Sequence, residues 1–296
     1  MRQGRMGRRV REALAFAWLT LPAVILVTAF VLVPFVMSLS YSFTKWNGLD
    51  KVPTFIGLGN YKALLKDTGM ARTLAFTFKY MACVVVLTNV VSLVLAVLLD
   101  SKIRGERVLR TGFFLPYITS LIVVGYIWKF ILSKGFSSLF DLTHVGLFGL
   151  SWLGDSTLAF VSVVFVSVWQ AIGFYLVVYV AGLQTVPREV LEAATIDGAG
   201  AVRKFFRVTF PLIMASVTVC VFYAITNALK AFDVIFVLTE GGPGTATTSV
   251  ALTIYQTAFI YSRFGYGTAQ SAVLFLFILV VTVLQLTVFK RREVEA

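Results

Sequence analysis

Six long apolar stretches restrict the fold of this chain more than any other feature of its sequence. They cover about residues 14–38, 73–99, 111–132, 157–183, 212–238 and 268–289. At 1.5 Å per residue, a helix of such a length crosses a hydrocarbon core of ~30 Å. The sequence therefore predicts an all-α integral membrane protein with six transmembrane helices.

Composition supports this class. The chain has 296 residues, of which 58% are hydrophobic, and its mean hydropathy is +0.88. A soluble chain of this length would be about half apolar. A basic head before an apolar run is also typical of a cleaved signal peptide, but the stretch 14–38 is too long for one. We expect a basic N-terminus at 1–13, one transmembrane domain at 14–289 and a tail at 290–296.

The basic residues are distributed unequally between the two sides of these six spans. Sixteen fall in the N-terminal head, the link between spans 2 and 3, the break between spans 4 and 5, and the C-terminal end, whereas seven fall in the other segments. The positive-inside rule then places both termini and the break after span 4 in the cytoplasm. The net charge of +12 thus follows membrane sidedness, and we expect lipid rather than nucleic acid around the chain.

The polar break at 186–211, VPREVLEAATIDGAGAVRKFFRVTFP, interrupts the apolar sequence. Pro187 suits the start of a short helix, and Gly198 and Gly200 are typical helix stops. A second short helix from Ala201 brings Phe205 and Phe206 to the surface, and the chain re-enters the membrane at Pro211. The break therefore predicts a docking surface better than an active site.

The spacing within this break resembles a known motif. Glu192-Ala193-Ala194 is followed after three residues by Gly198, and nine residues later by Val208, one residue and Phe210-Pro211. This run is similar to the EAA loop of ABC-importer permeases, which reads EAA, three residues, Gly, nine residues, Ile, one residue, Leu-Pro. Val208 and Phe210 depart from it but stay apolar. The neighbouring 196–199 further resembles the carbohydrate-uptake branch of the maltose and glycerol-3-phosphate type.

This resemblance implies a function and a set of partners. The helix pair 188–206 is expected to dock into a separate ATPase that carries the ATP and Mg²⁺, so that this chain binds no cofactor itself. The coupling residues it implies are Glu192, Ala193, Ala194, Asp197, Gly198, Phe206 and Pro211. Two cytoplasmic ATPase subunits, a second, related but distinct permease subunit and an extracytoplasmic solute-binding protein would complete an importer in the bacterial or archaeal cytoplasmic (inner) membrane.

Polar residues inside the spans have two interpretations, both open at this point. Gln170 and Asn227 lie at similar predicted depths, and such groups either hydrogen-bond between helices or line a wet cavity. In the second case Trp169 and Tyr175 would offer flat faces to a sugar ring on a substrate path. Lys230 joins that path or forms an i,i+3 ion pair with Asp233.

Other functions lack the residues they need. The cysteines Cys83 and Cys220 and the single histidine, His144, form no readable metal motif, and no GxxxxGK[ST] sequence occurs. We therefore expect neither a metal site nor catalytic residues. A secondary transporter would need coupling carboxylates within the spans, and it stays an alternative together with an ABC permease for a non-sugar solute.

Overall fold

The computed structural model describes residues 16–100 and 105–290, without the side chains of 288–290. These residues are mostly helical and fall into two compact units, one ending at Lys66 and including Gln256–Val273, the other comprising Asp67–Tyr255 and the chain from Leu274. The predicted head at 1–13 and residues 291–296 of the predicted tail lie outside the described residues.

The first unit holds the predicted first span and the segment that follows it. A helix covers Phe16–Tyr41 and includes a π-helical turn, η1 (Thr28–Leu32), and α2 (Val33–Tyr41). Two-residue strands β1 (Thr44–Lys45) and β2 (Thr54–Phe55) pair antiparallel before α3 (Gly59–Leu65), and η4 (Gln256–Ile260) also belongs to this unit.

Buried Asn60 holds this unit together. Its amide nitrogen donates to the backbone oxygens of Ser42, Thr44 and Gly265, at 2.9, 2.8 and 3.2 Å. Gly265 lies in the first turn of α15 (Phe264–Lys290). A buried carbonyl without a donor is costly, so one side chain here stabilises three segments.

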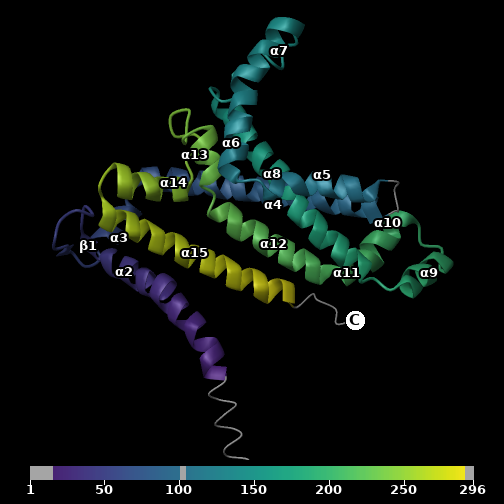
Figure 1. Ribbon diagram of the computed structural model, residues 1–296, viewed down its shortest axis with the longest axis horizontal. Coiled ribbons are helices and arrows are strands. Elements are labelled where there is room, and N and C mark those ends of the chain that lie inside the picture. Colours follow the sequence, from purple (N-terminus) through teal and green to yellow (C-terminus); the bar gives the residue numbers. More distant parts are fainter. Residues whose placement is uncertain (1–15, 101–104, 291–296) are drawn as a thin grey trace, which may run out of the picture. The chain divides into compact units, whose positions relative to one another are not determined.

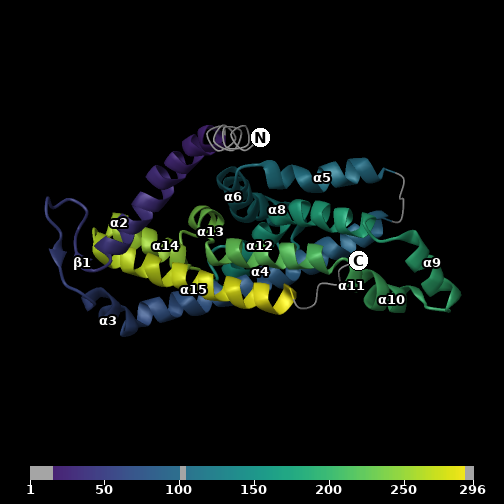
Figure 2. The same cartoon turned by 90° about the horizontal axis from the view of Figure 1, so that it is seen from below.

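The second unit is a helix bundle (Figures 1 and 2). Its helices are α4 (Thr68–Asp100), α5 (Glu106–Ile118), α6 (Leu121–Phe130), η2 (Ile131–Gly135), α7 (Phe136–Thr143), α8 (Ser156–Gln184), α9 (Arg188–Ile196), α10 (Ala201–Lys204), η3 (Phe205–Thr209), α11 (Phe210–Leu212), α12 (Met214–Leu229), α13 (Asp233–Leu238) and α14 (Val250–Tyr255). α8 packs against α4, α5 and α12, and it is the most buried of the candidate spans.

Glycines set the closest approach between these helices. A Cβ added at Gly173 of α8 would lie 2.6 Å from Phe114 Cα and still closer to the Phe113 carbonyl oxygen of α5. At Gly125 of α6, an added Cβ would lie 2.9 Å from Val237 Cβ of α13. Backbones can approach this closely only where one partner lacks a side chain.

Within residues 16–100 and 105–290, five helices are long and apolar enough to cross a membrane, and a sixth counts if the pair Ala201–Leu212 and Met214–Leu229, bent by 74°, is one span. The spans predicted at 14–38, 73–99, 157–183 and 268–289 correspond to single helices: Phe16–Tyr41, α4, α8 and α15.

Two predicted span boundaries are wrong. The stretch 111–132 is not one helix, because the chain is extended at Thr119 and Ser120, and the apolar helix of spanning length runs instead over Leu121–Thr143. Pro116 supplies no N–H for the last turn of α5, which weakens the helix just before this break. The stretch 212–238 likewise divides into α12 and α13, with a break at 230–232.

Candidate functional site

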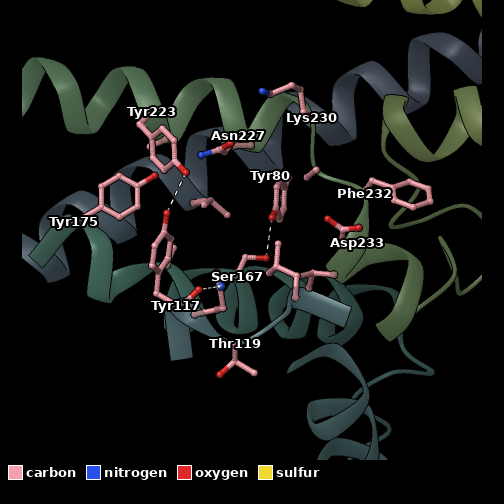
Figure 3. Close-up of a pocket in the computed structure, with 18 residues that line it drawn as sticks. Tyr80, Tyr117, Thr119, Ser167, Tyr175, Tyr223, Asn227, Lys230, Phe232 and Asp233 are labelled. Carbon is pink, nitrogen blue, oxygen red and sulfur yellow. Dashed lines mark hydrogen bonds between the residues drawn. The ribbon is translucent and has the colours of Figure 1, made fainter. Parts of the chain in front are cut away.

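A cavity of about 470 Å³ lies within the second unit, between α4, α5, α8 and the broken end of α12 (Figure 3). Both breaks border this cavity, since Thr119 from the first and Lys230, Ala231 and Phe232 from the second are among its lining residues. Irregular backbone at membrane depth is tolerated where it lines a cavity. Both helix breaks therefore lie where their backbone lines the cavity.

Four tyrosines supply much of the polar lining. Tyr80 of α4 donates to Ser167 Oγ of α8 at 2.8 Å, and Ser167 donates in turn to the Val163 carbonyl at 2.7 Å. Buried hydroxyls are thus satisfied by a chain of hydrogen bonds on this wall.

The opposite wall joins α5, α8 and α12. The hydroxyls of Tyr117 and Tyr223 lie 3.2 Å apart, and Gln170 Nε2 donates to the Tyr117 carbonyl at 3.2 Å. The phenol oxygen of Tyr175 points toward Tyr223 (Figure 3). Gln170 is therefore an interhelical donor and a lining residue at once, so the two interpretations of its role do not exclude each other.

The broken end of α12 contributes Asn227, Lys230 and, at the start of α13, Asp233. No salt bridge joins Lys230 to Asp233 in the described part of the chain. The i,i+3 ion pair is therefore not formed, because the break at 230–232 removes the helical geometry that would bring the two side chains together.

Four of the five residues predicted for a substrate path, Gln170, Tyr175, Asn227 and Lys230, line this cavity. Trp169 does not: its ring packs edge-on against Trp128, with centroids 5.5 Å apart, beside a smaller apolar hollow. Successive residues on a helix point about 100° apart. Ala171, on one side of Gln170 in the sequence, lines the cavity, whereas Trp169, on the other side, faces away from it.

Sequence reasoning did not single out several lining residues, among them Tyr80, Tyr117, Ser167 and Tyr223. A signal for two of them was present. Ser167 lies three residues before Gln170, and Tyr223 lies four residues before Asn227, which places each pair on one helix face.

The segment 186–211 forms two short helices beyond the ends of α8 and α12 (Figures 1 and 2). α9 ends in a Schellman motif: Gly198 has φ +75°, its N–H donates to the Thr195 carbonyl, and the Ala199 N–H donates to the Ala194 carbonyl. The predicted glycine stop is confirmed at Gly198. Lys204 Nζ contacts Thr195 Oγ1 at 3.2 Å and links the two helices.

This helical hairpin presents an apolar surface. Ile196, Val202 and Phe206 are 86%, 72% and 62% exposed. Among the residues predicted to couple to an ATPase, Glu192, Ala193, Asp197, Gly198 and Phe206 are exposed, whereas Ala194 and Pro211 are half-buried. Exposed apolar side chains at a polar rim are typical of a protein-binding surface.

Within the residues that the structure describes, no three His, Cys, Asp or Glu side chains are placed to hold a metal ion. Two lysines in the helices of the second unit each contact a neighbouring side chain. Lys129 Nζ contacts Glu240 Oε1 at 3.1 Å, and Lys79 Nζ lies 4.3 Å from the centroid of the Phe160 ring.

Comparisons with known proteins agree with this architecture. The chain is 39% identical over 279 residues to the probable starch degradation products transport system permease protein AmyD of Thermoanaerobacterium thermosulfurigenes, covering 94% of this chain and 95% of that protein. It is 34% identical to the multiple sugar-binding transport system permease protein MsmF of Streptococcus mutans, covering 91% and 93%. It is 35% identical to the sn-glycerol-3-phosphate transport system permease protein UgpA of Salmonella typhimurium, covering 90% and 91%.

The fold is also shared with a solved structure. A chain of a bacterial ABC transporter involved in the import of the acidic polysaccharide alginate superposes with a TM-score of 0.82 at 18% identity, covering 97% of this chain and 99% of that one. Residues 89–294 match the family described as the inner membrane component of binding-protein-dependent transport systems. The chain therefore belongs to this family of multi-pass inner-membrane permease proteins.

Proposed function

We propose that this chain is the permease subunit of an ATP-driven, binding-protein-dependent importer for a carbohydrate or sugar-like solute. The observation that carries the proposal is the hairpin at 186–211, which exposes apolar side chains beside charged ones at one end of the bundle. The named solutes of two similar proteins, starch degradation products and multiple sugars, support the carbohydrate class.

In this proposal the hairpin docks into a separate ATPase on the cytoplasmic side, and both termini face the same side. Phe206 and Val202 fill an apolar hollow of the ATPase, Glu192 and Asp197 make polar contacts at the rim, and Gly198 fixes the angle between the helices. ATP and Mg²⁺ bind to two such ATPase subunits. A second permease subunit completes the pathway, and an extracytoplasmic solute-binding protein delivers the solute.

The cavity in the second unit provides the solute path. Its volume falls within the usual range for small-molecule sites of about 300–1,000 Å³. Ring faces of Tyr117 and Tyr223 stack on sugar rings, while phenol hydroxyls and the Asn227 amide exchange hydrogen bonds with sugar hydroxyls.

Two glycines of the hairpin give a matched test. No atom lies within 4 Å of a Cβ added at either Gly198 or Gly200, but only Gly198 has positive φ. Gly200 has φ −65° and ψ 162°, which valine adopts readily. Gly198→Val therefore strains the turn at a cost of about 1–3 kcal/mol, whereas Gly200→Val does not.

The assay uses the complete importer in proteoliposomes and measures ATP hydrolysis and solute uptake. We expect Gly198→Val to lose most uptake per ATP hydrolysed, or to lose the ATPase on purification, while Gly200→Val keeps both. Equal coupling in the two variants would refute the docking role of this turn. A chain that copurifies with no ATPase would refute the proposed function.

A further inference from the structure

The cavity holds two charged side chains, and they are placed differently. Asp233 begins α13, is half-buried, and directs its carboxylate into the cavity on the side of Tyr80 and Ser167 (Figure 3). Lys230 is exposed, and its amino group extends along α12, away from Asp233 (Figure 3). The described residues include no salt bridge between the two, so Lys230 compensates the charge of the carboxylate only in part.

The remaining polar lining is uncharged. It consists of the hydroxyls of four tyrosines, Ser167 and Thr119 and the amides of Gln170 and Asn227. Lys230 is the one cation among the lining residues that the structure describes, and no arginine is among them. Bound anions need charge-assisted donors, which arginine supplies best. A sugar hydroxyl, by contrast, donates directly to a carboxylate.

We propose that Asp233 is a specificity-determining residue that makes this cavity select uncharged polyhydroxylated solutes and reject anionic ones. The inference rests on the proposed function, because it refines the solute class of the same cavity. At an effective dielectric constant of about 20, repulsion between two unit charges about 6 Å apart weakens binding by about a hundredfold. Partial compensation by Lys230 reduces this effect to about tenfold.

A purely structural role for Asp233 predicts something different. A carboxylate in the first turn of a helix interacts favourably with the helix dipole. If that were its whole contribution, Asp233→Asn would lower stability, and it would change the binding of neutral and anionic solutes equally.

The test uses the full chain, assembled with its partner permease and ATPase in lipid nanodiscs without the binding protein, so that selection by the binding protein is removed. Equilibrium dialysis measures the binding of two trisaccharides of similar size, neutral maltotriose and trianionic trigalacturonate. We expect the wild type to prefer maltotriose by at least about tenfold at low salt. The preference should shrink at about 0.5 M NaCl, because salt screens the repulsion.

Substitutions separate charge from shape. Asp233→Asn should reduce the preference at least about threefold by strengthening trigalacturonate binding, with maltotriose affinity changed less than about twofold. Asp233→Glu should keep the preference, and Lys230→Gln should preserve or increase it. Equal binding of both trisaccharides to the wild type, or an unchanged preference in Asp233→Asn, would overturn the inference and leave the carbohydrate proposal standing. Binding of neither trisaccharide would overturn both. If Asp233→Asn does not assemble, loss of the preference in Asp233→Glu overturns the inference.

Discussion

Replacement of Gly173 by alanine tests the close approach of α5 and α8. A Cβ at this position would lie 2.6 Å from Phe114 Cα, so backbone rather than a side chain would have to move. Inserting a methyl group into such a contact lowers the free energy of unfolding by about 1–3 kcal/mol. We expect a value of about 3 kcal/mol here, because backbone atoms cannot move aside as a side chain can. Alanine regains about 1 kcal/mol of helix propensity. The net expected loss is about 2 kcal/mol, or roughly thirtyfold in the unfolding equilibrium.

Gly112→Ala in α5 is the matched control, because no atom lies within 4 Å of a Cβ added there. It should be neutral or stabilise by up to about 1 kcal/mol. Unfolding by SDS titration of the purified chain in detergent micelles, followed by far-UV circular dichroism, measures both variants. The separation of α5 from α8 should also weaken the bond from Gln170 to the Tyr117 carbonyl and reduce maltotriose binding. Equal stability of the Gly173 and Gly112 variants would refute the packing argument.

Three further predictions concern polar contacts. Asn60→Ala should destabilise the first unit by about 1–3 kcal/mol, because the carbonyls of Ser42 and Thr44 lose the bond from this side chain, whereas the Gly265 carbonyl keeps the bond from Thr268 Oγ1. Limited proteolysis of the β1–β2 segment should accelerate, and unchanged cleavage would contradict this. Ser167→Ala should lower the free energy of unfolding by about 1–3 kcal/mol, and Tyr80→Phe by about 0.5–1.5 kcal/mol, because only Ser167→Ala leaves the buried Tyr80 hydroxyl without an acceptor. SDS titration measures both losses. A larger loss in Tyr80→Phe would be evidence against the hydrogen-bond direction. Lys129→Gln should lower the free energy of unfolding by less than about 1 kcal/mol, because its ion-pair partner Glu240 is largely exposed. A loss of stability that persists at high salt would argue against a surface ion pair.

Much of the fold follows from apolar length and turn chemistry alone. Residues 157–183 predict α8 to within one residue at each end, and Gly198 ends α9 as its position after the alanine-rich turn indicates. Both features depend on local sequence, which is why they are predictable. The extended residues Thr119 and Ser120 lie inside an otherwise apolar run, so hydrophobicity gives no sign of the break.

The candidate site was predictable in part, for a related reason. Gln170 and Asn227 are conspicuous as polar residues in apolar spans, and both line the cavity. Tyr117 is amphipathic and suits lipid-facing and buried positions equally well, so only the packing of α5 against α8 reveals its role. Tyr223 is equally amphipathic, and its spacing from Asn227 is the one sequence signal that places it on the cavity face. The ion pair between Lys230 and Asp233, one of two interpretations of Lys230, assumed a continuous helix that the break at 230–232 interrupts.

The paired interruptions have a mechanical consequence. α6 and α13 pack against each other where Gly125 meets Val237, and each follows a short non-helical stretch, at 119–120 and 230–232. A tilt of both segments as one block would change backbone torsions at these two stretches and leave the hydrogen bonds within α4, α8 and α12 intact. It would also have to break the contacts of α6 and α13 with α8, where Val124 and Ile235 are buried in one cluster with Val163. The packing of this block on α8, rather than the helical hydrogen bonds, therefore sets the cost of moving this wall of the cavity.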